Sequence, residues 1–346
     1  MYLHALATAL PDEALSQSQC WELFERSPAR LRLNRRSRLI LHNLFHGKHG
    51  IDRRHFAVPD MGRIFDLTPD ELNAAFREAA PRLAAQALRR ALDRTGGLRA
   101  AKLDALIVCT CTGYLCPGLT SYVAELTGMR EDAFLQDLVG LGCGAALPSL
   151  RAAGYFLAAH PDATVACIAV EICSAAFFLD DDPGVLVSAS LFADGAAATI
   201  WRAAPGPTPL RARDFDTIHR PDDRDKLRFE MRGGKLRNLL DRAVPELAAE
   251  AVSCLWRRRG PRPVSRVCSH SGGADVLTAL SAALPDHSLA ASEKVLRTCG
   301  NMSSPTVLFA LEETLRTGAL PDASADFWLV SFGAGFSAHS CRLAAG

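Results

Sequence analysis

A cysteine between glycines is the residue of this sequence best placed to do chemistry. Cys143 lies in the run LVGLGCGAAL (138–147), where the glycines permit a sharp turn from a strand into a helix. A thiol at such a turn faces the N–H groups of the helix start, and both this position and a nearby imidazolium lower the pKa of a cysteine. We therefore predict that Cys143 is a nucleophile with a histidine partner. The alternative is one more small buried side chain.

Two later segments contain candidate partners. His270, in CSHSGGADVL, follows a predicted buried strand and precedes a glycine pair that opens a helix. Asn301, in CGNMSSPTVLFAL, follows a glycine and precedes a serine pair and a helix. Taken singly, a histidine at a strand end is usually a structural hydrogen-bonding group, and an asparagine after glycine is usually a turn or cap. Together, the three residues at the ends of elements favour one shared site.

At these residues the sequence resembles the type III polyketide synthases, the chalcone and stilbene synthase relatives in the thiolase superfamily. GNMSSPTVLFALEE is close to the family's asparagine motif, and LVGLGCGAAL is similar to its nucleophile segment, especially in bacterial members. In SHSGGADVL, Ser271 takes the proline position of a His-Pro-Gly-Gly motif, and in LFADGAAATI Ala193 replaces the first glycine of Phe-Gly-Asp-Gly. The terminal loop SFGAGF departs from Gly-Phe-Gly-Pro-Gly at Ser331 and Ala334.

The resemblance implies a decarboxylative condensing enzyme, an acyltransferase whose substrates are acyl-CoA and malonyl-CoA. Cys143 would carry the starter and the growing chain as a thioester, and His270 would keep it ionised. The His270 ring N–H and the Asn301 amide would form an oxyanion hole for the charge that develops when malonyl-CoA loses carbon dioxide. Loss of such a donor typically costs about 100- to 1000-fold in rate. No metal and no cofactor besides the CoA thioesters is expected.

Other positions take their expected roles from the resemblance alone. Phe192 and Phe229 would line the entrance between the CoA tunnel and the cavity. Lys48 would meet the CoA phosphates, while the family's two other basic positions fall near Leu41 and Leu44. The expected cavity-lining residues, of which Cys116 lies on a loop reaching into the partner subunit, are Cys111, Thr112, Cys116, Cys173, Ala176 and Ser303.

The product is the least determined feature. Small side chains at Cys173, Ala176 and Ser303 leave room in the cavity, which favours an aliphatic acyl-CoA starter and an alkylresorcinol or alkylpyrone. The competing interpretation is a malonyl-only synthase of the phloroglucinol or naphthalene type, or an aromatic starter. Other function classes are a single-round ketoacyl synthase III-like enzyme, a hydroxymethylglutaryl-type enzyme and a non-catalytic partner subunit. The segment SHSGG argues against the ketoacyl synthase. A glutamate motif that a hydroxymethylglutaryl-type enzyme would need has no match here, and the retained Cys, His and Asn argue against a non-catalytic subunit.

Composition indicates a small-molecule enzyme of the cytoplasm. The 346 residues contain 39 Lys+Arg and 38 Asp+Glu, so the net charge of +1 gives no field for nucleic acid or an anionic membrane. Eleven cysteines, an odd number, lie mostly in apolar runs, which indicates reduced thiols, and their spacing does not fit a zinc site. No run approaches the roughly 20 apolar residues of a membrane span.

The elements that must position these residues follow an α/β pattern. Helical spacing predicts surface helices, including 70–95, and β-branched apolar runs predict buried strands at 103–110, 163–172 and 196–201. Beyond the proline-rich 202–210, a second set comprises helices at 234–256, 274–284 and 304–318 and strands at 264–270, 327–332 and 336–343. We expect two halves, 1–203 and 204–346.

The resemblance implies how these halves are arranged. It predicts a thiolase-like, five-layered αβαβα fold of two similar halves, with the site at their interface. It also implies a homodimer, with the segment before Cys143 and the loop around Cys116 at the two-fold axis. The apolar run YLCPGLTSYVAELTG would leave an exposed patch on a monomer, which such an interface would cover.

Overall fold

Nine strands form one large sheet in the computed structural model, which describes residues 1–47, 49–58, 60–206, 210–317 and 326–345. In spatial order the strands are β11 (Arg266–Ser269), β12 (Asp326–Gly333), β13 (Ser337–Ala345), β8 (Leu210–His219), β1 (Tyr2–Ala9), β7 (Asp194–Arg202), β6 (Thr164–Ile172), β4 (Ala105–Thr110) and β5 (Phe134–Val139). The pairs β5–β4, β4–β6 and β11–β12 are parallel, and the other neighbours are antiparallel.

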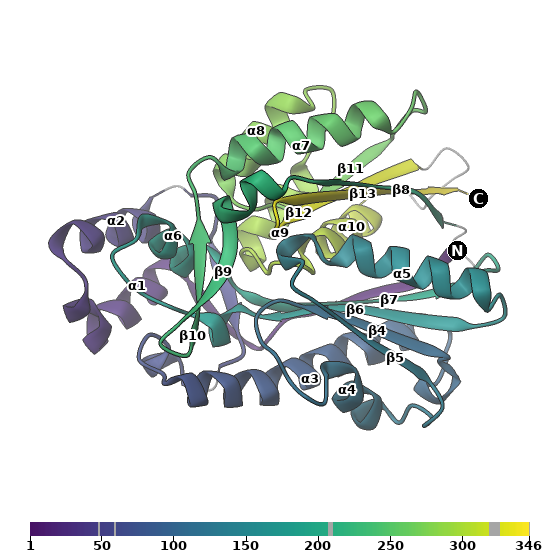
Figure 1. Ribbon diagram of the computed structural model, residues 1–346, viewed down its shortest axis with the longest axis horizontal. Helices are drawn as coiled ribbons and strands as arrows, with labels where there is room; N and C mark the ends of the chain where they lie inside the picture. The colour runs from purple at the N-terminus through teal and green to yellow at the C-terminus, as the bar shows by residue number, and fades with distance from the viewer. Residues whose placement is uncertain (48, 59, 207–209, 318–325, 346) are drawn as a thin grey trace.

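The sheet divides between β1 and β8. These two strands pair only at Tyr2 with Arg211 and at Leu3 with Leu210, so the strands on either side diverge into two layers (Figure 1). Outward from this junction, each side runs through two antiparallel neighbours to a parallel pair. The strand order is therefore repeated across the junction.

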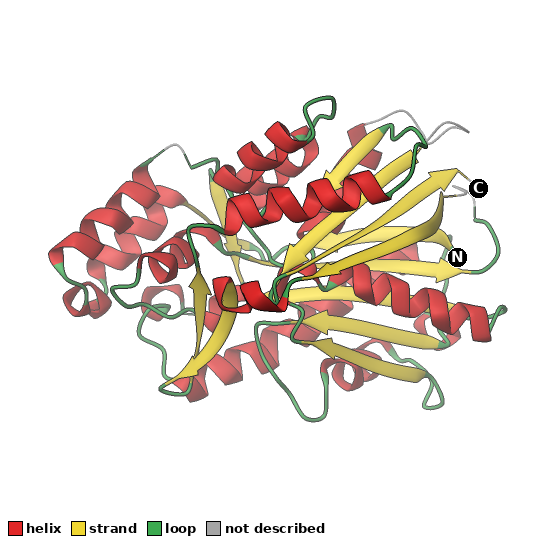
Figure 2. Cartoon of the chain, turned by 45° about the horizontal axis from the view of Figure 1, so that its top comes forward, coloured by secondary structure: helices red, strands yellow, loops and turns green. Residues whose placement is uncertain are grey.

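Helices complete five layers around these two sets of strands (Figures 1 and 2). The outer helices α3 (Pro69–Asp93) and α4 (Leu119–Thr127) cover one set, and α7 (Val244–Arg258) and α8 (Ala274–Ala283) cover the other. The middle layer is formed by α5 (Ala146–Ala159) and α10 (Thr306–Thr317), against which α9 (Ala290–Cys299) packs. This is the αβαβα order expected from the sequence.

Each interface between layers has its own apolar core. Leu88 of α3 packs with Ile168 of β6, and Leu255 of α7 packs with Trp328 of β12. The middle core joins α5 and α10 to both sets of strands. All nine residues of β6 are buried, as the continuous apolar run at 163–172 predicts for a central strand.

The remaining elements gather at the left of Figure 1, beyond the end of the large sheet. They are α1 (Gln17–Arg26), α2 (Arg35–His46), α6 (Pro183–Leu191), the pair β2 (Glu13–Ser16) and β3 (Arg53–Phe56), and the hairpin β9 (Leu227–Arg232) and β10 (Lys235–Leu240). Their core includes Phe24, Phe56 and Phe192, and Cys143 packs against it half-buried. This group therefore covers the candidate site.

One of two predictions about helices needs correction. The helix expected over 234–256 is wrong in its first part, because Gly233 and Gly234, with φ of +57° and +76°, turn the chain into β10. The surface helix expected over 70–95 is confirmed, with its alanine- and leucine-rich face buried against the sheet and its charged face exposed. In the ranges described, no helix combines the length and apolar character needed to cross a bilayer.

Candidate active site

Cys143 lies on a tight turn between β5 and α5. β5 ends at Val139, residues Gly142–Gly144 form one turn of 3-10 helix, and α5 begins at Ala146. Gly140 and Gly142 have φ of +85° and +56°, which glycine adopts without the steric cost of a side chain. The strand-to-helix turn expected from the glycine spacing is confirmed.

The end of β12 packs closely against this turn. A Cβ atom on Gly333 would lie 2.8 Å from the backbone nitrogen of Cys143 and 2.6 Å from that of Gly144, so only glycine fits this approach. Ser331 donates a hydrogen bond to the carbonyl of Gly144 at 3.0 Å. The serine that departs from the family loop pattern thus holds the nucleophile turn, and Ala334 lines the cavity beside it.

His270 follows β11 and is almost fully buried, with 1% of its surface exposed. Its backbone N–H donates to the carbonyl of Val330 at 2.9 Å, which fixes it to the end of β12. The ring packs edge-on against Phe332, with centroids 5.1 Å apart, and its Nδ1 atom has no hydrogen-bond partner among the described residues. The imidazole is thus held by packing and by the backbone.

Asn301 follows Gly300, whose φ of +76° ends α9 and turns the chain. Its Nδ2 atom donates to the carbonyl of Gly272 at 2.6 Å, and its Oδ1 atom accepts from the backbone N–H of Ser303 at 2.7 Å. An amide NH2 group has two hydrogens. One hydrogen therefore remains available for a ligand in the cavity.

Two adjoining cavities meet at Cys143. The outer cavity is lined by Cys143, His270, Asn301 and Phe192, so the structure brings together the three residues that the sequence singled out. The inner cavity also contains Cys143 and Phe192 in its wall. The predicted residues that line this inner cavity are Cys111, Thr112, Cys173, Ala176, Phe229 and Ser303.

Burial governs the protonation of both the thiol and the imidazole. It raises the pKa of Cys143 to about 12, although a hydrogen bond from Ser303 opposes the shift, and it lowers the pKa of His270 to about 3. The lowered thiol pKa expected from the helix start is therefore wrong for the empty cavity. Both shifts oppose an isolated charge, whereas a proton passed from sulfur to ring creates two opposite charges that stabilise each other.

Comparisons with known proteins agree with this arrangement. A model of the FAE1/type III polyketide synthase-like proteins matches residues 35–206. The 1,3,6,8-tetrahydroxynaphthalene synthase of Streptomyces peucetius subsp. caesius is 32% identical over 350 residues, covering 97% of this chain and 90% of that enzyme. The chain belongs to the type III polyketide synthases. It is thus an acyltransferase of the condensing class.

Two further relatives define the fold and the subgroup. The 3,5-dihydroxyphenylacetyl-CoA synthase of Streptomyces toyocaensis is 31% identical, covering 78% of this chain and 73% of that enzyme. The crystal structure of 1,3,6,8-tetrahydroxynaphthalene synthase from Streptomyces coelicolor A3(2) matches with a TM-score of 0.86 and 25% identity, covering 99% of both chains. The expected thiolase-like fold and the similarity to bacterial members are confirmed.

A buried carboxylate beneath the nucleophile of this polyketide synthase is absent from the sequence predictions. Glu171, at the end of β6, is fully buried, and burial raises its pKa. It accepts hydrogen bonds from the backbone N–H of Cys111 at 2.9 Å and from the hydroxyl of Ser304, and Ser303 Oγ lies 3.5 Å away. Ser303 in turn donates to the sulfur of Cys143 at 3.2 Å. A single acidic residue inside the apolar run ATVACIAVEI is the one sequence signal for it.

A buried arginine, Arg54, supports the Phe192 wall and is likewise missing from the sequence predictions. Its guanidinium donates to the backbone carbonyls of Ala189 and Phe192, both at 2.9 Å, and to the side chain of Gln17 at 3.0 Å. The side chain is 1% exposed and lies over the ring of Phe56, 5.0 Å from its centroid. The C-terminal end of α6 is thereby fixed where it borders both cavities.

The expected contacts to the CoA phosphates stay predictions. Lys48 lies outside the described residues. Leu41 is fully buried and Leu44 lines the outer cavity, so neither supplies a positive charge. Besides Cys143 and His270, the charged or titratable side chains that line the outer cavity are His49, Asp241, Arg242 and Asp275. Cys116 is exposed and lies in neither cavity wall, and its place in a partner's cavity stays a prediction.

Proposed function

We propose that this chain condenses malonyl-CoA units iteratively on Cys143 and cyclises the resulting polyketide. The observation that carries the proposal is the meeting of Cys143, His270 and Asn301 in one outer cavity that adjoins an inner cavity at Phe192. The thiol attacks the starter thioester and expels CoA-SH, so the chain is held by a bond that a carbon nucleophile can later break. His270 takes the thiol proton in this step.

Decarboxylation is the second role of the same site. When the malonyl carboxylate leaves as carbon dioxide, its electron pair becomes an enolate whose charge resides on the thioester oxygen. The free amide hydrogen of Asn301 and a ring N–H of His270 are the donors we assign to that oxygen. The apolar wall around Phe192 favours loss of carbon dioxide, because water that would stabilise the carboxylate is excluded. No cofactor other than the CoA thioesters is required.

We assign CoA to the outer cavity and the growing chain to the inner one. Phe192 borders both cavities, and Phe229 borders the inner one, which suits residues at the passage between them. The phosphates of CoA would lie toward His49, Arg242 and Lys48. The inner cavity, with Cys111, Thr112, Cys173, Ala176 and Ser303 in its wall, would contain the chain during extension and ring closure.

The starter decides the product class. Both relatives named above make polyhydroxylated aromatic skeletons without an alkyl tail, as their names state, and this supports a malonyl-only synthase. An aliphatic starter leading to an alkylresorcinol or alkylpyrone is the second candidate. It is supported by the phenylalanine side chains that line the inner cavity, Phe177, Phe178, Phe192 and Phe229.

We also infer that the enzyme is a cytoplasmic homodimer composed of two similar halves per chain, 1–203 and 204–346. The repeated strand order on either side of the β1–β8 junction supports the halves. Exposed apolar side chains on the edge strand β5, including Phe134 and Val139, support an interface there. The cysteines are free, and most of them are buried, which suits a reducing compartment.

Mass spectrometry of the intact protein and of its products tests the proposal. The enzyme is incubated with malonyl-CoA alone, then with acetyl-, hexanoyl-, lauroyl- and coumaroyl-CoA added. We expect acyl adducts on the Cys143 peptide, none in Cys143→Ala, and products with several added two-carbon units. Absence of any adduct and of any malonyl-derived product would refute the function. Extension of lauroyl-CoA in preference to malonyl-CoA alone would refute the malonyl-only starter.

A further inference from the structure

The hairpin β9–β10 forms one wall of the inner cavity without belonging to the large sheet. Leu227, Arg228 and Phe229 of β9 and Asn238 of β10 line the cavity. The two strands pair only with each other in the described structure, so no backbone ladder ties them to the rest of the protein. Packing and side-chain contacts, in place of a backbone ladder, therefore position this wall.

The opposite wall is the segment that leads into α6, together with α6 itself. Phe177 and Phe178 precede the helix, and Val185, Ser188 and Ala189 come from its first two turns. The width of the inner cavity between Phe229 and these residues is thus the distance between two separate pieces of the fold. Whatever joins the hairpin to the start of α6 determines that width.

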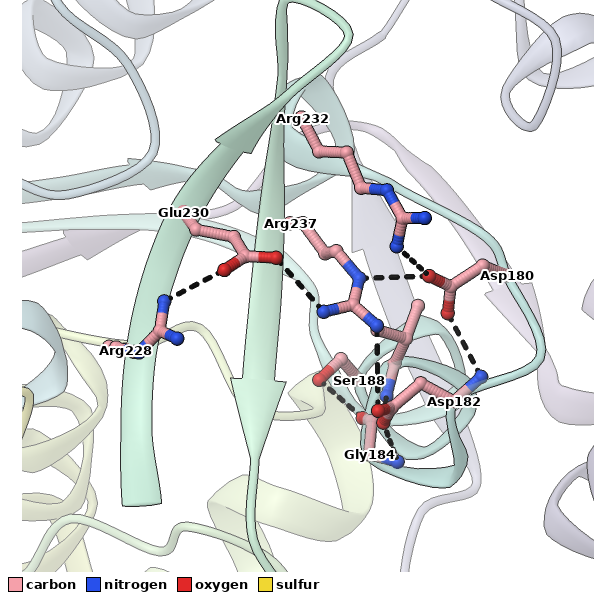
Figure 3. A network of polar contacts seen from close by, with 9 residues as sticks. Asp180, Asp182, Gly184, Ser188, Arg228, Glu230, Arg232 and Arg237 are labelled. Carbon is pink, nitrogen blue, oxygen red and sulfur yellow. Dashed lines mark hydrogen bonds and ion pairs between the residues drawn. The ribbon is translucent and has the colours of Figure 1, made fainter. Parts of the chain in front are cut away.

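Arg237 on β10 joins them through three carboxylates (Figure 3). Its Nε atom lies 2.8 Å from Asp180, its Nη2 atom 3.4 Å from Asp182 and its Nη1 atom 3.0 Å from Glu230. Asp180 and Asp182 belong to the α6 side, and Glu230 belongs to β9. The side chain of Arg237 is only 10% exposed, so water screens these pairs weakly. We call these four residues the Arg237 cluster.

The cluster also fixes the start of α6. Asp182 is the N-cap residue, and its carboxylate accepts from the backbone N–H groups of Gly184 at 2.8 Å and Val185 at 3.4 Å. A Cβ atom on Gly184 would lie 2.3 Å from the carbonyl oxygen of Leu240, so the helix start and β10 are in close backbone contact. The guanidinium therefore acts where the two walls already touch.

Only arginine has the geometry for this position. Its guanidinium is planar and presents five N–H donors in a fixed fork, so it meets carboxylates on different sides at once. A lysine ammonium keeps the charge but has a single nitrogen. On the outside of the cluster, Arg232 approaches Asp180 at 3.3 Å and Arg228 donates to Glu230 at 2.9 Å. These two arginines neutralise the remaining acidic charge.

We propose that Arg237 is a positioning residue that sets the width of the inner cavity and thereby the number of extensions before release. This inference rests on the proposed function, because it assigns the inner cavity to the growing chain. With Arg237 in place, Phe229 is held at a fixed distance from the α6 wall, and the chain is confined until it cyclises. Without it, the hairpin moves, water enters and shorter chains leave by hydrolysis of the Cys143 thioester, giving a free acid and the thiol.

Product ratios test the proposal, because a general loss of stability lowers all products together. In Arg237→Gln we expect malonyl loading of Cys143 at the wild-type level, while the ratio of full-length cyclised product to shorter released acids falls about tenfold, as a small misplacement of a reacting chain can cause. Arg237→Lys should give an intermediate ratio. An unchanged ratio in a folded, loading-competent Arg237→Gln variant overturns the proposal.

Two further variants keep the experiment decisive. Asp180→Asn removes one contact of the cluster and perturbs the fold less than Arg237→Gln does. Because both variants act on the same cluster, their effects on the product ratio should not add in the double variant. Arg342→Gln is the matched control, since Arg342 is a buried arginine paired with Asp326 on β12 and lines neither cavity. A shifted ratio in this control, or additive effects of the two cluster variants, would also contradict the proposal. If wild type forms no adduct at Cys143, the proposed function itself fails.

Discussion

Ser303 donates its hydroxyl hydrogen to the sulfur of Cys143 over 3.2 Å. The backbone of Ser303 has a φ of +61°, a left-handed conformation that is uncommon for a residue with a side chain. Its N–H donates to the Oδ1 atom of Asn301 at 2.7 Å, which stabilises this conformation. Asn301 therefore does two things: it offers an amide hydrogen to the cavity, and it fixes the serine that contacts the nucleophile.

Removing this hydroxyl should slow the reaction of the thiol. The hydrogen bond from Ser303 lowers the pKa of Cys143, so Ser303→Ala raises it further and leaves less thiolate at neutral pH. A hydrogen bond to a charged group contributes about 1.5 kcal/mol or more, which corresponds to roughly tenfold slower alkylation. The rate of iodoacetamide labelling of the Cys143 peptide measures this.

Ser304→Ala is the matched control for that experiment. Ser304 donates to Glu171, as Ser303 approaches it, but no hydrogen bond joins Ser304 to the sulfur of Cys143 in the described chain. Its labelling rate should stay near that of wild type. Equal rates for Ser303→Ala and wild type would show that the hydrogen bond does not stabilise the thiolate.

The proton acceptor of Cys143 can be identified from a pH profile. Without an imidazole, burial leaves a thiol whose pKa is about 12, so labelling of His270→Gln should rise about tenfold for each pH unit between 7 and 10. If His270 accepts the proton, the two groups form an ion pair in wild type, and labelling at pH 7 should be at least about tenfold faster than in the variant. Matching profiles for the two proteins would exclude His270 as the acceptor.

Gly333 should tolerate no side chain. Gly333→Ala places a methyl group less than 3 Å from the backbone nitrogens of Cys143 and Gly144, so the nucleophile turn must move. A displacement near 1 Å at the reacting atom can cost about 100-fold in rate. Product formation should therefore collapse while the protein stays folded by circular dichroism. Gly154→Ala, where the φ is not positive and the nearest atom lies 3.8 Å away, tests whether the loss is specific to the close approach.

The sequence predicts that Cys143, His270 and Asn301 share one site because each follows the end of a strand or helix. A glycine stands beside Cys143 and Asn301 and two residues after His270, and the three residues line one cavity. Each of these residues is positioned by a local turn. Such a turn can be recognised from a few residues of sequence. Glu171 is different, because its partners come from residues 110–112 and 303–304, which only the folded sheet brings together. No spacing rule along the chain connects such residues.

The strands of the two sets were predictable where they are continuous buried apolar runs. The central strands β1 and β8, which polar residues interrupt, are absent from the sequence predictions, as is the edge strand β5. β6 and β4 are continuous apolar runs, whereas β5, at the edge of the sheet, has the sequence FLQDLV and mostly exposed or half-buried side chains. The prediction for the hairpin β9–β10 is wrong for another reason. LRNLL has the apolar spacing of a helix, but the glycine pair before it signals the turn of a hairpin. Local pattern and turn chemistry conflict there, and the turn determines the structure.

The edge strand β5 leads to a prediction about assembly. Phe134, Leu135 and Val139 on this strand are 47%, 40% and 55% exposed, an unusual concentration of apolar surface at an unpaired edge. We expect sedimentation velocity to give a species of twice the 37.2 kDa chain mass at micromolar concentration. Like charges at the edge should oppose pairing, so the double variant Leu135→Asp/Val139→Asp should sediment as a monomer.

A matched variant separates an interface effect from a general effect of surface charge. Leu39 on α2 is 61% exposed and lies at the opposite end of the molecule from β5 (Figure 1). Leu39→Asp should therefore remain dimeric. If Cys116 enters the partner's cavity, the β5 variant should also lose product formation in parallel with its dimer content as concentration falls. A wild-type monomer, or a β5 variant that stays dimeric, would place the interface elsewhere or remove it.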